Sequence, residues 1–224
     1  MTQDEAKQKV AEAALQYLPE EGIVGLGSGS TAKLFINGVG RLVSGGRKLK
    51  GVPTSEASRE QAISLGIELL SDDGPWVIDV CVDGADEVSA SLDLIKGGGG
   101  CQTREKIVNQ AAKKNIIVVD ESKLSEKLGE KWPIPVEVLS FAHQATVAQL
   151  QQHGEPSLRM RDGKPWMTDA GNYIYDLAAG ILAEPAELDA KLLNIPGVVE
   201  TGLFVQRADL VLIAGSDGVR ELTL

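Results

Sequence analysis

The first 130 residues alternate short apolar runs with segments whose apolar residues recur at helical spacing. A capping box, Thr2 followed by Glu5, marks the start of the first helix. Alternating strands and helices are typical of a mostly parallel, doubly wound sheet. The runs predict strands at 23–26, 48–53, 67–70, 77–82 and 116–119, and the spaced segments predict helices ending near residue 18 and covering 32–43, 55–65 and 103–113.

The alternation of apolar runs and helical segments changes after residue 130. Strands are expected at 134–139, 157–161 and 198–204, helices at 143–153 and 185–193, and a hairpin from 166–168 and 173–177. Apart from one hairpin arm, this order is the βαββαβ pattern of a ferredoxin-like α+β unit. A last apolar run, 210–214, is expected to return to the first sheet. We therefore predict a Rossmann-like α/β domain over 1–130 plus 205–224 and a smaller ferredoxin-like domain over 131–204, the latter a candidate oligomer interface.

Charge and length narrow the classes of function. The 224 residues include 22 Lys and Arg against 32 Asp and Glu, a net charge of −10. This balance argues against a nucleic-acid binder, which must neutralise phosphates with clustered cations. No apolar run approaches the roughly 18 residues of a membrane span, and the polar first residues are unlike a signal peptide. With only two cysteines, we expect a cytoplasmic globular protein with no nucleic-acid or membrane partner.

Glycine is concentrated early, with 16 of 25 in the first 100 residues. One cluster, Gly25–Thr31, joins a predicted strand to a predicted helix. Its backbone N–H groups, its hydroxyls and the helix N-terminus suit a phosphate. The spacing matches neither GxGxxG nor a Walker A loop, which disfavours NAD and ATP. A tight turn with a hydroxyl cap is the structural alternative.

Three carboxylates follow the predicted strand 77–82, within Asp83–Glu87. Neighbouring carboxylates at a strand end repel one another, which raises pKa values and suits proton handling. A Mg²⁺ site is a rival, since hard cations take carboxylate oxygens. An acidic turn that caps a helix is the alternative without chemistry.

Four consecutive glycines follow Lys96 and precede a predicted helix. Free N–H groups beside a lysine form a cradle for an anion or oxyanion, whereas a flexible linker is the alternative. Glu105 lies a few residues further on, in Thr103–Lys106. A lone glutamate in a first helical turn is normally solvent-facing. The adjacent cradle makes Glu105 a candidate base.

These clusters together resemble the A type of ribose-5-phosphate isomerase. The matching motifs follow the same order along essentially the whole chain. Each motif is weak alone, but together they are highly specific. The chain departs from the family at Ser28, where the family often has Thr, and at Cys101–Gln102, where it commonly has small or apolar residues. The matching segments are 27–31, 83–87, 96–99, 103–106, 118–123, 133–138 and 195–204.

The resemblance implies an aldose–ketose isomerase that interconverts D-ribose 5-phosphate and D-ribulose 5-phosphate through an enediolate, in the non-oxidative pentose phosphate pathway. It implies no metal, no organic cofactor and a homo-oligomer, with a dimer favoured. Glu105 is the implied base, with Asp83 assisting ring opening and Lys96 stabilising the enediolate. The implied substrate-binding residues are Ser28, Gly29, Ser30, Thr31, Asp83, Gly84, Ala85, Asp86, Lys96, Gly97, Gly98, Gly99, Lys123 and Lys7.

Three other functions compete with this interpretation. A sugar-phosphate-sensing regulator would need a DNA-binding helix pair, but residues 1–20 hold a single acidic helix. A CoA-transferase-type enzyme also uses a glutamate beside glycine-rich loops, but forms a thioester on it. A Mg²⁺-dependent sugar phosphatase would use Asp83 and Asp86 as metal ligands, and its activity would be lost in EDTA.

Overall fold

The structure, a computed structural model, describes residues 2–223 and contains two compact units. The first unit comprises 2–85, 104–123 and 207–223, and the second comprises 86–103 and 124–206. Residues 1 and 224, the ends of the predicted first domain, lie outside the described residues. Residues 86–103 pack with the second unit, because the chain forms short antiparallel strands there.

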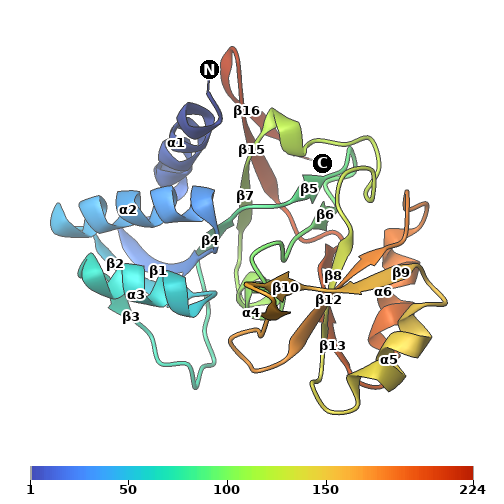
Figure 1. The fold of residues 1–224 in the computed structure, drawn as a ribbon. Helices are drawn as coiled ribbons and strands as arrows, with labels where there is room; N and C mark the ends of the chain where they lie inside the picture. Colours follow the sequence, from blue (N-terminus) through green and yellow to red (C-terminus); the bar gives the residue numbers. More distant parts are fainter. Residues whose placement is uncertain (1, 224) are drawn as a thin grey trace. The chain divides into compact units, whose positions relative to one another are not determined.

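A seven-stranded sheet in the order β16-β15-β7-β4-β1-β2-β3 forms the centre of the first unit (Figure 1). All neighbouring pairs are parallel except β15 with β16. This arrangement confirms the predicted doubly wound α/β fold. The strands are β1 (Glu21–Leu26), β2 (Lys48–Pro53), β3 (Glu68–Leu69), β4 (Val80–Asp83), β7 (Asn115–Asp120), β15 (Leu210–Gly215) and β16 (Gly218–Leu222).

Helices cover both faces of this sheet. The helices are α1 (Gln3–Ala14, followed by the 3-10 turn η1, Leu15–Tyr17), α2 (Ser30–Ser44), α3 (Glu56–Ser64) and α4 (Gln102–Gln110). Val10, Phe35 and Ala62, from α1, α2 and α3, belong to one buried apolar cluster on the sheet. Val108 of α4 packs with Cys81 in a separate cluster, so Cys81 is a packing residue, as expected. No helix within 2–223 combines the length and apolarity needed to cross a membrane.

The strand order places the loops after β1 and β4 at a switch point. The chain runs outward from β1 to β2 and β3 in one direction, and from β4 to β7 and β15 in the other. Loops at the carboxyl ends of such neighbouring strands diverge and leave a crevice where ligands bind in doubly wound folds. Residues 27–29 follow β1, and residues 84–85 follow β4.

The second unit contains a four-stranded antiparallel sheet in the order β13-β8-β12-β9. With α5 and α6, this is the expected ferredoxin-like βαββαβ arrangement. A three-stranded sheet, β14-β6-β5, accompanies it. The elements are β5 (Glu87–Val88), β6 (Leu94–Ile95), β8 (Ile134–Val138), α5 (His143–Leu150), β9 (Glu155–Leu158), β12 (Tyr173–Ala178), α6 (Pro185–Leu193), β13 (Val198–Thr201) and β14 (Leu203–Phe204).

Three local predictions differ from the structure. The expected strand 198–204 is divided into β13 and β14, which pair in different sheets. The expected strand 157–161 is divided into β9 and β10 (Met160–Arg161). The expected hairpin of 166–168 with 173–177 is reduced to one bridge, between Met167 and Tyr173. The hairpin that forms instead pairs β10 with β11 (Lys164–Pro165). Its turn, Asp162–Gly163, has positive φ at both residues, the conformation that Asp-Gly favours in tight hairpins.

Candidate active site

The glycine-rich loop after β1 leads directly into α2. Gly29 precedes the helix with a φ of 94°, in the region that favours glycine, and no side chain caps the helix. The first-turn N–H groups of α2 are therefore available to an anion, and the helix dipole favours one there. The Ser28 hydroxyl lies 2.7 Å from Thr54 Oγ1 and donates to Ser55 Oγ at 2.8 Å. The hydroxyl of Ser28, a predicted substrate-binding residue, is thus hydrogen-bonded to the two hydroxyls that directly follow β2.

Asp83 is the last residue of β4 and is almost fully buried. Its Oδ1 accepts hydrogen bonds from the backbone N–H groups of Ser28, at 2.9 Å, and Gly84, at 2.8 Å. A Cβ on Gly27 would lie 2.3 Å from the same oxygen. The first unit therefore brings the loop after β1 and the acid at the end of β4 together, as their positions after neighbouring strands predict.

Glu105 lies in the first turn of α4, yet the residue is only 5% exposed. The solvent-facing interpretation of a lone first-turn glutamate is therefore wrong. Its neighbour Arg104 lies nearer the surface and forms an ion pair with Glu56 at 2.7 Å. A carboxylate withdrawn from water is better suited to general base chemistry than one on a solvated helix face.

The glycine run and Asp86 come together within the second unit. The N–H group of Gly98 donates to Asp86 Oδ2 at 2.6 Å, and a Cβ on Gly98 would lie 2.6 Å from Asp86 Oδ1. Lys96 is 4% exposed, and its Nζ lies 5.4 Å from the centre of the Phe204 ring. A buried cation and a chain of glycine amides thus follow β6, and this set is suited to hold an oxyanion.

Glu87, the third carboxylate of the acidic segment, faces a different part of the molecule. It is fully buried and accepts hydrogen bonds from the backbone N–H groups of residues 129–132 at 3.0–3.3 Å. These bonds anchor a loop. Two of the three carboxylates, Asp83 and Asp86, therefore remain candidates for substrate chemistry.

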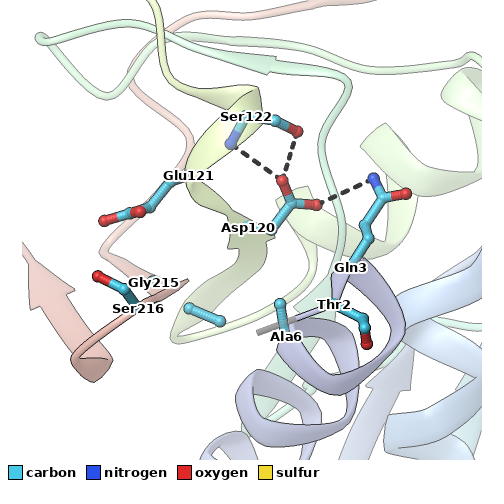
Figure 2. A pocket seen from close by; sticks show the side chains of 9 residues that line it. Thr2, Gln3, Ala6, Asp120, Glu121, Ser122, Gly215 and Ser216 are labelled. Atoms are coloured by element: carbon cyan, nitrogen blue, oxygen red, sulfur yellow. Dashed lines mark hydrogen bonds between the residues drawn. The ribbon is translucent and has the colours of Figure 1, made fainter.

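A pocket of about 370 Å³ opens at the carboxyl ends of β7 and β15, within the first unit (Figure 2). Burial alone would raise the pKa of Asp120. Hydrogen bonds from Ser122 and Gln3 and the charge of Lys123 outweigh it and hold this pKa below its usual 3.8. An ionised carboxylate in the wall disfavours a phosphate. The pocket is lined by Thr2, Gln3, Ala6, Asp120, Glu121, Ser122, Ala214, Gly215 and Ser216.

The two lysines predicted to bind the sugar phosphate do not line this pocket. Lys7, on α1, has its Nζ 4.0 Å from Asp4. Lys123 ends the short 3-10 turn η2 (Glu121–Lys123), which follows β7. Their roles in substrate binding remain predictions.

Comparison with known protein families identifies the chain. Residues 50–218 match the model of Ribose 5-phosphate isomerase A, also called phosphoriboisomerase A. The chain belongs to the ribose 5-phosphate isomerase A family. A ribose-5-phosphate isomerase A from Desulfatibacillum aliphaticivorans is 46% identical over 227 residues, covering 99% of this chain and 98% of that protein.

Solved structures of ribose 5-phosphate isomerases are similar to this chain along its whole length. The structure from Methanocaldococcus jannaschii is 41% identical, with a TM-score of 0.94 and full coverage of both chains. A D-ribose-5-phosphate isomerase in complex with phospho-erythronic acid is 38% identical, with a TM-score of 0.96 and again full coverage of both chains.

Two groups beside the isomerase motifs were not predicted from the sequence. Thr54 and Ser55 carry the hydroxyls that contact Ser28, and their position directly after a predicted strand was an available signal. Arg159 contacts the glycine run from a polar stretch between β9 and β10. Nothing in the local sequence pattern indicates that contact, because it joins segments about sixty residues apart.

Proposed function

We propose that this chain interconverts D-ribose 5-phosphate and D-ribulose 5-phosphate through an enediolate, with Glu105 as the base. The observation that carries this proposal is a 5%-exposed glutamate in a member of the ribose 5-phosphate isomerase A family. The reaction moves a hydrogen between two adjacent carbons and changes no overall oxidation state. A carboxylate that takes up a proton and returns it is sufficient for this chemistry.

The proton transfer follows from the open-chain sugar. Glu105 removes the proton from C2, and the electron pair of the C–H bond forms a C1=C2 double bond while negative charge moves onto the C1 oxygen. The glutamic acid then returns its proton to C1. The proton of the C2 hydroxyl passes to the C1 oxygen, which leaves a ketone at C2 and a hydroxyl at C1. Triosephosphate isomerase uses a glutamate in the same way. Before this step Asp83 assists the opening of the sugar ring.

The developing negative charge needs fixed donors. We assign the enediolate oxygen to Lys96 and the amides of Gly97–Gly99. The Gly98 N–H already donates to Asp86, so the N–H groups of Gly97 and Gly99 are the ones that face the oxyanion in this assignment. Removing one such donor usually slows a reaction about 100- to 1000-fold. Asp83 and Asp86 are assigned to the sugar hydroxyls. Each already binds backbone N–H groups, which fixes the orientation of its carboxylate.

The phosphate is assigned to Ser28–Thr31, with Lys7 and Lys123. The uncapped start of α2 supports this assignment, since its N–H groups and dipole attract an anion. In a chain of net charge −10, binding of an anionic sugar depends on such local donors.

The relative bound to phospho-erythronic acid supports the enediolate route. That acid has a phosphate at one end of a short hydroxylated chain and a carboxylate at the other. A carboxylate spreads negative charge over two coplanar oxygens, as an enediolate does. Metal independence, a homodimer, the cytoplasm and the non-oxidative pentose phosphate pathway remain predictions for this chain.

An isomerase assay on ribose 5-phosphate, run with and without EDTA, tests the proposal. We expect ribulose 5-phosphate to form at the same rate in both. In heavy water, product and recovered substrate should gain deuterium at the exchanging carbon if a base transfers the proton. Release of inorganic phosphate that stops in EDTA would instead favour the magnesium-dependent phosphatase.

A further inference from the structure

The glycine run is held on its carbonyl side by one arginine. Arg159 donates from Nη1 to the carbonyl oxygens of Gly97, at 2.7 Å, and Gly98, at 3.2 Å. Its Nε donates to Asp176 Oδ2 at 2.9 Å, and its Nη2 contacts Asp176 Oδ1. The side chain is 11% exposed, and its guanidinium carbon lies 5.4 Å from the centre of the Trp166 ring.

These bonds determine which side of each peptide faces outward, together with the hydrogen bond that the Gly100 N–H donates to the Gly97 carbonyl at 2.9 Å. In a trans peptide the C=O and the following N–H point in opposite directions, and the only cis peptide bond among residues 2–223 precedes Pro75. With the carbonyl of Gly97 bound to Arg159, the N–H of Gly98 faces away and reaches Asp86. By the same geometry, the N–H of Gly99 points away from Arg159.

Glycine peptides need such a constraint because they rotate easily. Gly97 has a φ of 100°, and a Cβ on Gly99 would meet nothing within 4 Å. A peptide that turned over there would present a carbonyl oxygen and would repel an anion. Hydrogen bonds from a guanidinium to the carbonyls also polarise the peptides and strengthen their N–H groups as donors.

Arg159 is poorly placed to serve as a substrate ligand itself. Four of the five N–H donors of a guanidinium are used by the two carbonyls and Asp176. Asp176 also balances the positive charge of the guanidinium. The pair therefore acts on the glycine run by orientation.

We propose that Arg159 is a positioning residue of the isomerase, which fixes the glycine run so that the Gly98 N–H holds Asp86 and the Gly99 N–H is presented to the enediolate. This inference rests on the proposed function. It predicts that Arg159 contributes mainly in the transition state, where negative charge develops on the oxygen, and little to ground-state binding of the sugar.

Arg159→Lys and Arg159→Met test the proposal, with Arg161→Met as the matched control. Arg161 is exposed, and its guanidinium carbon lies 5.5 Å from the centre of the same Trp166 ring. Replacing it removes a neighbouring arginine that also contacts this ring. For Arg159→Met we expect kcat to fall about 100-fold, the size of losing one oxyanion donor, with KM changed less than about threefold. Arg159→Lys keeps the positive charge but loses the several N–H donors of the guanidinium. Its kcat should therefore lie between those of the wild type and Arg159→Met.

Inhibition by phospho-erythronic acid separates positioning from a merely structural role. If Arg159 prepares the cradle for an enediolate, Ki for this acid should rise in parallel with the loss of kcat/KM, while KM for ribose 5-phosphate stays nearly constant. Thermal unfolding of Arg159→Lys should remain close to that of Arg161→Met. Arg159→Lys retains most interactions, so it serves as the test if Arg159→Met does not fold.

Two results would overturn the inference. If the wild type is active, the positioning role alone would be refuted by Arg159 variants that keep kcat within about threefold. It would also be refuted by variants that lose affinity for substrate and inhibitor equally. A wild type that does not isomerise ribose 5-phosphate would refute the proposed function and this inference with it.

Discussion

Oδ1 of Asp83 lies where a side chain on Gly27 would begin, 2.3 Å from the position of a Cβ atom. The acid at the end of β4 therefore occupies space that only glycine leaves open at the end of β1. The same oxygen accepts hydrogen bonds from Ser28 and Gly84, so the two loops hold one carboxylate in one orientation. The glycine excess in this part of the chain has a specific structural use here.

Replacing Gly27 with Ala should displace the carboxylate of Asp83 and lower kcat/KM at least about tenfold. The new Cβ would also lie 2.6 Å from the Asp83 Cα, so the backbone at the end of β4 must shift as well. The folding cost should therefore reach the upper end of the about 1–3 kcal/mol that is typical when a methyl group is inserted into a packed site. Kinetic assays of Gly27→Ala, Asp83→Ala and the double variant provide the measurement. If the methyl acts through Asp83, the double variant will be no slower than Asp83→Ala alone. Fully additive losses would show that Gly27 acts independently of Asp83.

Replacing Glu105 with Gln keeps the size of the side chain and removes the base. General base catalysis typically contributes about 100- to 10,000-fold, so kcat should fall within that range. Deuterium exchange from heavy water into the substrate should fall with it. Glu60→Gln, the same chemical change at an exposed position of α3, is the control and should remain active. Near-normal turnover by Glu105→Gln would contradict the assignment of the base.

The sequence predicted the large sheet well because its inner strands are continuous apolar runs. All of Asn115–Asp120 is buried, as in a parallel strand covered by helices on both faces. The edge strand β16 escaped prediction because it contains Arg220 and Glu221 and is not fully buried. The strands β5 and β6 have two residues each, too few to show any periodicity.

The candidate site was predictable where chemistry follows a strand, since the topology brings strand ends to one edge. Ser28 and Asp83 illustrate this, because β1 and β4 are hydrogen-bonded neighbours. The direction of a side chain was not predictable. Glu87 shares a segment with Asp83 and Asp86 but points into a separate loop, because four backbone N–H groups there require an acceptor.

Replacing Gln102 with Leu should stabilise the protein. Gln102 is fully buried, and neither its Nε2 nor its Oε1 has a hydrogen-bond partner among residues 2–223. A buried polar group without partners costs about 1–3 kcal/mol, and leucine fills a similar volume without polar atoms. Urea unfolding should therefore show a higher midpoint for Gln102→Leu with an unchanged slope. A lower midpoint would mean that the amide contributes favourable interactions that leucine cannot replace.

The ion pair between Asp79 and Lys113 should make stability depend on acid pH. Asp79 Oδ1 lies 2.7 Å from Lys113 Nζ, and Oδ2 accepts the backbone N–H of Ile23 at 2.9 Å. The hydrogen bond from Lys113, followed by that from Ile23, outweighs burial and holds the pKa of Asp79 below its usual 3.8. A carboxyl whose pKa is lowered by folding stabilises the protein above the unfolded-state pKa. That contribution is lost as the pH falls through the lowered folded-state pKa.

Asp79→Asn should therefore be less stable than wild type by about 1 kcal/mol at pH 7, a modest value because the site is partly exposed. The difference should shrink between about pH 4 and pH 2, because wild type loses the same charge there. Urea unfolding at several pH values measures it. Lys113→Met should reduce the pH-dependent part while Asp79 keeps its bond to Ile23, and the double variant should resemble Asp79→Asn. A stability difference that stays constant down to pH 2 would show that the effect of Asp79 does not depend on its charge.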